Sequence, residues 1–378
     1  MDHALIVSQS SPLDEATVRS RWNAEPTLRE IMLLALLSAI LFAATILQFQ
    51  NYRSAVTDFG DSEAYTSVAS AIHHWDFRGL QVKQFWGYPY AVAAVAALVH
   101  VSEQTSLLLV SVASSFISVV LAYRLWGGWV AGLFALLNFD WMQRSFLGGS
   151  EPLAVALIFG AFLALRKERY LLATLLACLS TVVRPLGIFC LIGIGLVLLY
   201  RHQFKRFIAA VAIGASVGAL YVLPLARHFG DALATVHSYQ GGQLPLFGLP
   251  FYAIIKGTLL YPAPVTNLAL SFGWILLVLA GITRMFFDPT FKAYVRKNPA
   301  EILFAAPFLL FVFSYNYPVF ARGNFARFAI PALPLIFLAL SYYMPKDRRL
   351  LWALGILAPI LAAGSALGIR NVIHLFRT

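Results

Sequence analysis

Residues 88–101 read YPYAVAAVAALVHV, an apolar stretch whose length decides how the rest of the chain is oriented in a membrane. The stretch has about fourteen residues, whereas a helix needs about twenty to cross the hydrocarbon core of a bilayer. An apolar helix of this length is typical of an interfacial or re-entrant segment. We therefore predict that residues 88–101 do not span the membrane.

The rest of the chain has the composition of a membrane protein. Of its 378 residues, 60% are hydrophobic and 12% are charged, about half the charged fraction of a typical soluble domain. Apolar runs of near-spanning length recur along the chain, and we predict an all-α polytopic membrane protein with about eleven transmembrane helices. These runs cover residues 31–50, 105–123, 129–141, 152–165, 170–183, 186–200, 207–225, 267–286, 301–315, 328–344 and 350–367.

The distribution of Lys and Arg supports a non-spanning segment 88–101. In that topology the cytoplasmic side collects 17 of the 28 basic residues, and if the segment spans, every later loop changes side and the ratio reverses. Basic residues favour the cytoplasmic side of membrane proteins, so the first topology is preferred. The 17 residues are Arg19, Arg21, Arg29, Arg124, Arg166, Lys167, Arg169, Arg201, Lys205, Arg206, Arg284, Lys292, Arg296, Lys297, Lys346, Arg348 and Arg349.

This topology predicts the domain organisation. A cytoplasmic tail, residues 1–30, precedes a single transmembrane domain, residues 31–378, without a C-terminal soluble domain. Two long loops face outward, residues 51–104 and residues 227–266, whereas the inner loops are short and basic. The basic residues form no continuous face, so the net charge of +11 does not indicate a nucleic-acid partner. We expect the functional site on the outer face, with the lipid bilayer around the domain.

The first outer loop contains an acidic cluster in the sequence TDFGDSEAY, residues 57–65. Asp58, Asp61 and Glu63 lie within six residues just beyond the first span. Carboxylates near hydrocarbon often belong to functional sites, and one in an apolar setting could act as a general base. The alternative is a solvated acidic turn that caps a helix beginning near Ser62.

The next outer turn, NFDWMQRSFLGGSEPLA at residues 138–154, carries Asp140, Arg144 and Glu151. Glu151 precedes Pro152, a residue favoured at the first position of a helix, and a carboxylate there complements the positive end of the helix. Glu151 is therefore either a helix-capping residue or one of the acids that face the first loop, as an acidic pair or as a metal ligand. We include Asp140 on the same acceptor or metal side.

Several basic residues occur where the positive-inside rule does not expect them. Arg184 lies at the outer end of a span in TVVRPLG, and Arg322 and Arg327 lie in ARGNFARFAIPALP. An arginine at the outer end of a span either extends its charge to water or binds phosphate, for which arginine is the preferred partner. The second long loop contributes His237 and Tyr239 as further pocket residues, with a spacing unlike a regular zinc motif.

These residues together predict an outward pocket with acids on one side and arginines on the other. Arginines could hold the phosphate of a lipid-linked donor, while a carboxylate deprotonates an attacking hydroxyl. The sequence lacks the glycine-rich nucleotide loops GxGxxG and GxxxxGK[ST], in agreement with a donor carried on a lipid. The sequence indicates no specific cofactor, and the acids are compatible with a divalent cation, Mg²⁺ or Mn²⁺.

Four motifs resemble the GT-C superfamily of membrane glycosyltransferases, especially bacterial relatives of protein O-mannosyltransferases and aminoarabinose transferases, and in the SEPL stretch the GPI mannosyltransferases. GDSEAY is similar to the acidic motif of the family's first loop, with Asp61 and Tyr65 at the matching places. GYPYAVAAVAALVHVSE resembles the amphipathic helix that closes this loop. GSEPLAVAL matches at Glu151, and STVVRPLG matches at Arg184. The resemblance covers about the first two hundred residues, after which only NFARFAIPALP is similar.

The resemblance implies an inverting, mannosyltransferase-like hexosyl transfer from a polyprenyl-phosphate sugar to a glycan, lipid or protein acceptor. It implies that the first-loop aspartate is the base, with Asp61 as first choice and Asp58 as second. It also implies the bacterial inner membrane with the active site facing the periplasm. Asp61 stands alone where many relatives have an adjacent Asp-Glu pair, which leaves acceptor and metal dependence open.

Two other classes of function remain compatible with the sequence. A transporter or flippase for lipid-linked sugars would also use outward acids and arginines, but it should show inverted repeats, which this sequence lacks. An oligosaccharide polymerase or ligase would use arginines and a histidine of a late outer loop, such as Arg227 and His237.

Overall fold

The computed structural model describes residues 23–78, 80, 84–240 and 247–375. Most of the predicted cytoplasmic tail and residues 241–246 of the second predicted loop lie outside the described residues. Within them the secondary structure is helical, apart from one isolated antiparallel bridge between Phe247 and Tyr315. The all-α prediction is therefore confirmed for the described part of the chain.

Five helices are long and apolar enough to cross a membrane, which is the character of an integral membrane protein. Two bent pairs, α8 with α9 and α16 with α17, raise this number to seven if each pair is one span. The predicted count of eleven spans is not confirmed, because several of the apolar runs form helices of nine to sixteen residues. The five long helices are α2 (Leu28–Phe49), α6 (Glu103–Trp126), α12 (Phe204–Phe229), α15 (Val265–Phe287) and α21 (Arg348–Leu375).

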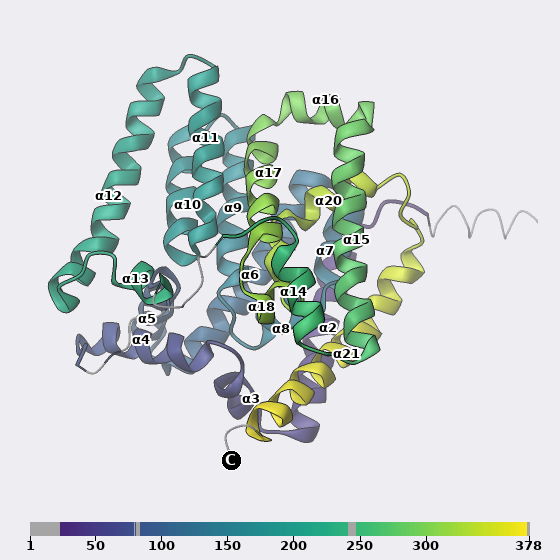
Figure 1. Cartoon of the computed structure of the whole chain (residues 1–378), viewed down its shortest axis with the longest axis horizontal. Helices are drawn as coiled ribbons and strands as arrows, with labels where there is room; N and C mark the ends of the chain where they lie inside the picture. Colours follow the sequence, from purple (N-terminus) through teal and green to yellow (C-terminus); the bar gives the residue numbers. More distant parts are fainter. Residues whose placement is uncertain (1–22, 79, 81–83, 241–246, 376–378) are drawn as a thin grey trace, which may run out of the picture.

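The remaining helices complete the bundle and the segments at its two ends (Figure 1). They are α3 (Tyr52–Asp58), α4 (Ser62–His74), α5 (Gly87–Val99), α7 (Gly128–Leu136), α8 (Phe139–Phe146), α9 (Glu151–Arg166), α10 (Tyr170–Val183), η1 (Pro185–Gly187), α11 (Ile188–Tyr200), α13 (Ala234–Gln240), α14 (Tyr252–Leu260), α16 (Pro289–Lys297), α17 (Pro299–Ser314), α18 (Pro318–Ala321), α19 (Phe325–Ala329), η2 (Ile330–Ala332) and α20 (Leu333–Leu340).

Local sequence signals set where these helices begin. The Ser102 hydroxyl accepts a hydrogen bond from the Thr105 amide at 3.3 Å and caps α6. The Asn138 side chain accepts from the Asp140 amide at 2.8 Å and caps α8. Such caps satisfy amides that have no partner within their own helix. The two caps fix the starts of the helices that carry Glu103 and Arg144.

The core lies where α6 to α9 meet, and it is filled by aromatic rings. Phe134 of α7 packs against Trp141 of α8 at 4.6 Å between ring centroids and against Phe159 of α9 at 5.5 Å. Trp126 at the end of α6 meets Phe159 edge to face. Helix α12, at the flank of the bundle in Figure 1, is largely exposed by contrast.

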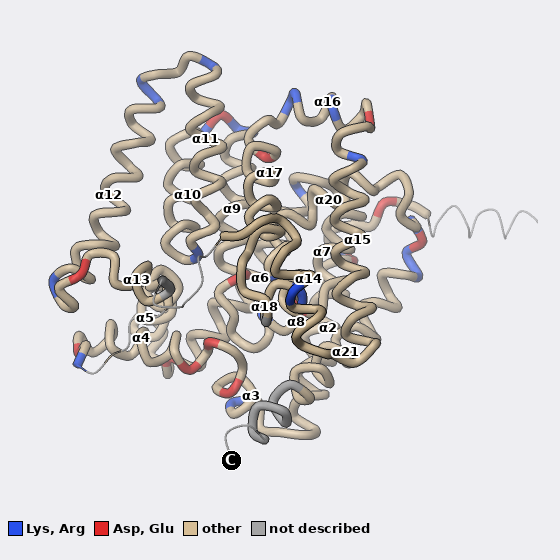
Figure 2. Tube along the Cα trace, in the orientation of Figure 1, with Lys and Arg blue, Asp and Glu red and all other residues tan. Residues whose placement is uncertain are grey.

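The charged residues separate toward the two ends of the bundle (Figure 2). Lys and Arg gather around α16 and the turns between α9 and α10 and between α11 and α12, which we call the basic end. At this end Arg166 forms an ion pair with Glu301 at 2.7 Å, and the Gly128 amide donates to Glu25 at 2.6 Å. The opposite end, which we call the loop end, carries α3, α4 and the acidic residues between them.

The first predicted outer loop begins and ends at the loop end. Arg53, just after α2, donates through Nε to Gln104 Oε1 at 2.6 Å, and Gln104 Nε2 donates to the Arg53 carbonyl at 2.8 Å. Gln104 lies in the first turn of α6, so the chain between these two residues makes no net crossing of the bundle. Within that segment α5 packs beside the start of α6, where Ser106 Oγ donates to the Val92 carbonyl at 2.6 Å. This agrees with the prediction that residues 88–101 do not span.

Candidate functional site

Glu151 is the centre of a buried ion-pair cluster at the loop end. It begins α9, directly before Pro152, and its side chain is 4% exposed. Its Oε1 atom contacts Arg327 Nε of α19 at 2.5 Å and Arg184 Nη1, at the end of α10, at 3.0 Å. One carboxylate oxygen thus forms ion pairs with two guanidinium groups from distant parts of the sequence.

Asp61 extends the cluster toward solvent. It is the residue that precedes α4, and its Oδ2 lies 3.6 Å from Arg327 Nη2. Its side chain is 43% exposed, in contrast to Glu151. The two acids therefore differ in what they can do, because Asp61 is accessible to a substrate while Glu151 is occupied by arginines.

Tyrosines and a serine connect the first loop to this cluster. The Tyr65 hydroxyl lies 3.0 Å from Ser150 Oγ, which also accepts a hydrogen bond from Arg184 Nη1 at 3.0 Å. Burial raises the pKa of Tyr65, so this hydroxyl stays protonated. Tyr88 of α5 packs edge to face on Tyr65 and donates to the Leu107 and Gly148 carbonyls at 3.1 Å each. The bonds hold α4 and α5 against the start of α9.

A cavity of about 740 Å³ lies beside the ion-pair cluster. Its charged lining residues are Asp58, Asp140, Arg144 and Arg322, and the residues that α15 and α21 contribute are largely apolar, such as Trp274. Gly60 and Ala326 also line it, and each is followed directly in sequence by a cluster residue, Asp61 or Arg327. The cluster residues themselves are not part of the cavity lining, but two of them directly follow residues that are.

Two arginines at the cavity wall have unused donors. Arg322 Nη1 and Arg144 Nε are buried and form no hydrogen bond among the described residues. Arg322 Nη2 donates to the Tyr261 carbonyl at 3.3 Å, and Arg144 lies over the Phe59 ring at 4.5 Å. Buried polar groups are nearly always satisfied, so these two donors are exceptions among the described residues.

A glycine allows Arg144 and Glu151 to come together. A Cβ atom on Gly149 would lie 2.7 Å from Arg144 Cβ and 2.8 Å from Glu151 Oε2, both too close for any other residue. The GGSEP turn therefore needs Gly149, because a side chain at this position would collide with both Arg144 and Glu151.

The structure brings together most of the predicted site residues but not all of them. Asp61, Tyr65, Glu151, Arg184 and Arg327 form the cluster, and Asp58, Asp140, Arg144 and Arg322 line the cavity. Glu63 is exposed on α4 and belongs to neither group.

The predicted residues of the second loop lie apart from this site. His237 bonds through Nδ1 to Asp231 at 2.7 Å on an exposed segment and is not part of the cavity wall. The side chain of Tyr239 lies outside the described residues.

Sequence reasoning missed Ser150 and Tyr88. Ser150 stands directly before Glu151, but its hydroxyl bonds to Tyr65 and Arg184, two contacts that the SEP sequence does not indicate. Tyr88 lies in the quoted segment 88–101, but nothing in its spacing indicated two carbonyl acceptors, one in α6 and one in the turn before α9.

The acids at the cavity could still hold a divalent cation, as predicted. Asp58 and Asp140 are the carboxylates on its wall. Within the described residues, the three-residue group whose ligand atoms lie close enough to share an ion is a different one, His73, His74 and Glu103. The dependence of the site on Mg²⁺ or Mn²⁺ stays a prediction.

Comparisons with known proteins give one kind of match. No family model matches the sequence, and no curated protein matches it. Among solved structures, the chain is similar to the crystal structure of ArnT from Cupriavidus metallidurans in the apo state, an aminoarabinose transferase of the GT-C type. The identity is 12% and the TM-score 0.47, over 80% of this chain and 59% of the ArnT chain. The protein thus spans about three fifths of the length of that structure.

Proposed function

We propose that this chain is a GT-C-type glycosyltransferase that transfers a sugar from a polyprenyl-phosphate donor to an acceptor hydroxyl at the non-cytoplasmic face of the bacterial inner membrane. The observation that carries the proposal is the arrangement at the loop end. A half-exposed carboxylate, Asp61, contacts the mostly buried Arg327, and chain neighbours of both residues line a cavity whose lining is partly charged and largely apolar. A donor with an anionic phosphate and an apolar chain is complementary to such a lining.

In this reaction Asp61 is the general base. It removes the proton from the acceptor hydroxyl while the acceptor oxygen bonds to the anomeric carbon. The bond from that carbon to the phosphate oxygen breaks, and polyprenyl phosphate leaves with the electron pair, so the configuration inverts. Asp61 suits this role because it is accessible, whereas Glu151 is enclosed by two guanidinium groups. Asp58, on the cavity wall, is the second choice.

Arginines stabilise the charge that develops on the leaving phosphate. Arg322 and Arg144 line the cavity, and Arg327 and Arg184 of the ion-pair cluster add positive charge near it. Glu151 balances part of this charge and fixes the directions of Arg184 and Arg327. Asp140 and Glu63 remain candidates for the acceptor or metal side, and the acceptor is a glycan, a lipid or a protein.

The test is sugar transfer by purified protein in liposomes supplied with polyprenyl-phosphate sugars, comparing wild type with Asp61→Asn. General base catalysis contributes about 10²–10⁴-fold, so the variant should lose at least a hundredfold in rate while it still binds the donor. Asp76→Asn is the matched control, because it removes an exposed carboxylate from the same loop without touching the cavity. Transfer with and without EDTA then reports the need for Mg²⁺ or Mn²⁺.

Other results would redirect the proposal. Undiminished transfer by Asp61→Asn would place the base at Asp58 or elsewhere. Absence of transfer from every donor, together with translocation of the lipid-linked sugar between leaflets, would identify a transporter instead. Extension of a glycan chain that depends on His237 would favour a polymerase or ligase.

A further inference from the structure

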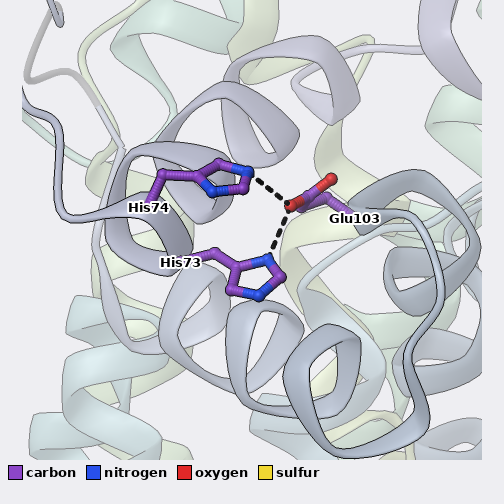
Figure 3. A group of neighbouring side chains, drawn as sticks. All are labelled: His73, His74 and Glu103. Atoms are coloured by element: carbon purple, nitrogen blue, oxygen red, sulfur yellow. Dashed lines mark hydrogen bonds and ion pairs between the residues drawn. The ribbon is translucent and has the colours of Figure 1, made fainter.

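Two histidines and a glutamate converge at the loop end, outside the cavity (Figure 3). His73 and His74 are the last two residues of α4, and Glu103 is the first residue of α6. His73 Nδ1 lies 2.9 Å from Glu103 Oε1, and His74 Nε2 lies 4.0 Å from the same oxygen. Three ligand atoms, one from each residue, fall within 4.8 Å of one another.

The helix ends explain how these side chains meet. Trp75, directly after α4, has a φ of 54°, so the chain turns away and leaves both imidazoles on the last turn of the helix. The two rings stack at 4.8 Å with an angle of 17° between their planes. Glu103 lies next to the capping residue Ser102, which fixes the start of α6. The arrangement therefore places two parallel imidazoles beside one carboxylate.

A single ion pair does not account for both histidines. His73 already satisfies the hydrogen bond to Glu103, and His74 Nε2 is too far from the oxygen for a second one. Two stacked imidazoles aimed at one oxygen are an arrangement that a shared cation would stabilise, because it bonds to all three groups at once.

We propose that His73, His74 and Glu103 bind a Zn²⁺ ion, with water in the fourth position. Zinc bonds to imidazole nitrogen and carboxylate oxygen are about 2.0–2.2 Å long, which places tetrahedral ligands roughly 3.3 Å apart. The spacings of 2.9, 4.0 and at most 4.8 Å bracket this value, and small rotations of exposed side chains bring them to it. Imidazole selects zinc over Mg²⁺ or Mn²⁺.

The site would tie the far end of α4 to the start of α6. About thirteen residues of α4 separate it from Asp61, a length of roughly 20 Å along the helix. Bound Zn²⁺ therefore holds the helix that begins directly after Asp61 without taking part in the proposed transfer. The inference does not rest on that reaction, and its test needs no transfer assay.

The experiment titrates Zn²⁺ alone into chelator-treated, detergent-purified full-length protein against a competing fluorescent chelator. Wild type should bind one Zn²⁺ per chain at this site, and His74→Ala should weaken that binding at least tenfold. His74 is 66% exposed, so this variant should fold normally. His237→Ala is the matched control, since it removes an exposed histidine bonded to one carboxylate, and it should leave the affinity unchanged.

A second measurement identifies the ligands independently of affinity. X-ray absorption at the zinc edge of the loaded wild type should show a shell of nitrogen and oxygen with two imidazoles. Equal affinity in wild type and His74→Ala, loss of binding in His237→Ala alone, no binding by wild type, or a shell containing sulfur would each overturn the proposal.

Discussion

Glu151→Gln tests whether the buried ion pairs hold the loop end together. The change removes the charge that faces Arg184 and Arg327 while it preserves the shape of the side chain. Arg327 is 12% exposed and Arg184 is 22% exposed, so water can solvate neither guanidinium fully after the change. Removal of one partner from a buried ion pair costs about 3–5 kcal/mol, and we expect a loss of stability in this range.

A second buried ion pair supplies the matched control. Glu301 is 3% exposed at the basic end, where it contacts Arg166 at 2.7 Å and also accepts from Trp126 at 3.0 Å. Glu301→Gln should therefore reduce the free energy of unfolding by a similar amount. Only Glu151→Gln should reduce sugar transfer per folded molecule, because Glu301 lies at the end opposite to the cavity.

The assay is equilibrium unfolding in mixed detergent micelles, combined with the transfer assay on the folded fraction. The double variant Glu151→Gln, Arg327→Gln adds a test of coupling, since it should lose less stability than the sum of the two single variants. A loss below about 1 kcal/mol for Glu151→Gln would refute the reasoning, because exposed pairs contribute only that much. An equal loss of sugar transfer in Glu301→Gln would show that the loss does not depend specifically on the Glu151 cluster.

Two further predictions concern the first loop. Gly87→Ala should destabilise the protein by about 1–3 kcal/mol in the same unfolding assay, because the added Cβ would lie 2.4 Å from the Val182 carbonyl carbon. Gly218→Ala is the control and should be neutral or stabilising, because no atom lies within 4 Å of the added Cβ. Equal effects of the two variants would contradict the packing of α5 on α10. Hydrogen bonds from Arg78 lower the pKa of Asp76 to about 2, so the stabilising contribution of this pair is complete above the ordinary value near 4 and is lost as the pH falls toward 2. Arg78→Gln should return the pKa of Asp76 toward 4 in a carboxyl ¹³C NMR titration, and an unchanged pKa would exclude the pair.

The sequence predicted the character of the first loop better than the number of spans. The segment 88–101 was expected not to span, and the hydrogen bonds between Arg53 and Gln104 agree with this expectation. The prediction was possible because the length of an apolar segment and the distribution of Lys and Arg can be counted in the sequence. The number of spans was less predictable. Inside a bundle, neighbouring helices can cover short or bent segments such as α7 and α8, so an apolar run does not have to form one straight helix.

Of the candidate site, the residue types were predictable and the pairings were not. Asp61, Glu151, Arg184 and Arg327 stood out as charges close to apolar runs. Their mutual contacts join positions up to 266 residues apart, and no single-sequence pattern encodes them. The sequence also left Glu151 open between a helix cap and a site acid.

Buried clusters at the other end were missed for a similar reason. Glu301 and Arg166 come from helices far apart in the sequence, and only the packing of α9 against α17 shows that they pair. At the loop end, the exposed His73 and His74 were not among the predicted site residues, because their partner Glu103 lies thirty positions later.

The order in which the Glu151 contacts can form follows from the order of synthesis. Arg184 emerges soon after Glu151, whereas Arg327 follows roughly 140 residues later, about 7–28 s at ordinary ribosomal speed. During that interval Arg184 and the earlier Arg144 are the arginines available to the glutamate, and the short turn after α10 keeps Arg184 within reach. Arg184 is then the first direct contact partner of Glu151, and Arg327 completes the centre only after most of the chain has been made.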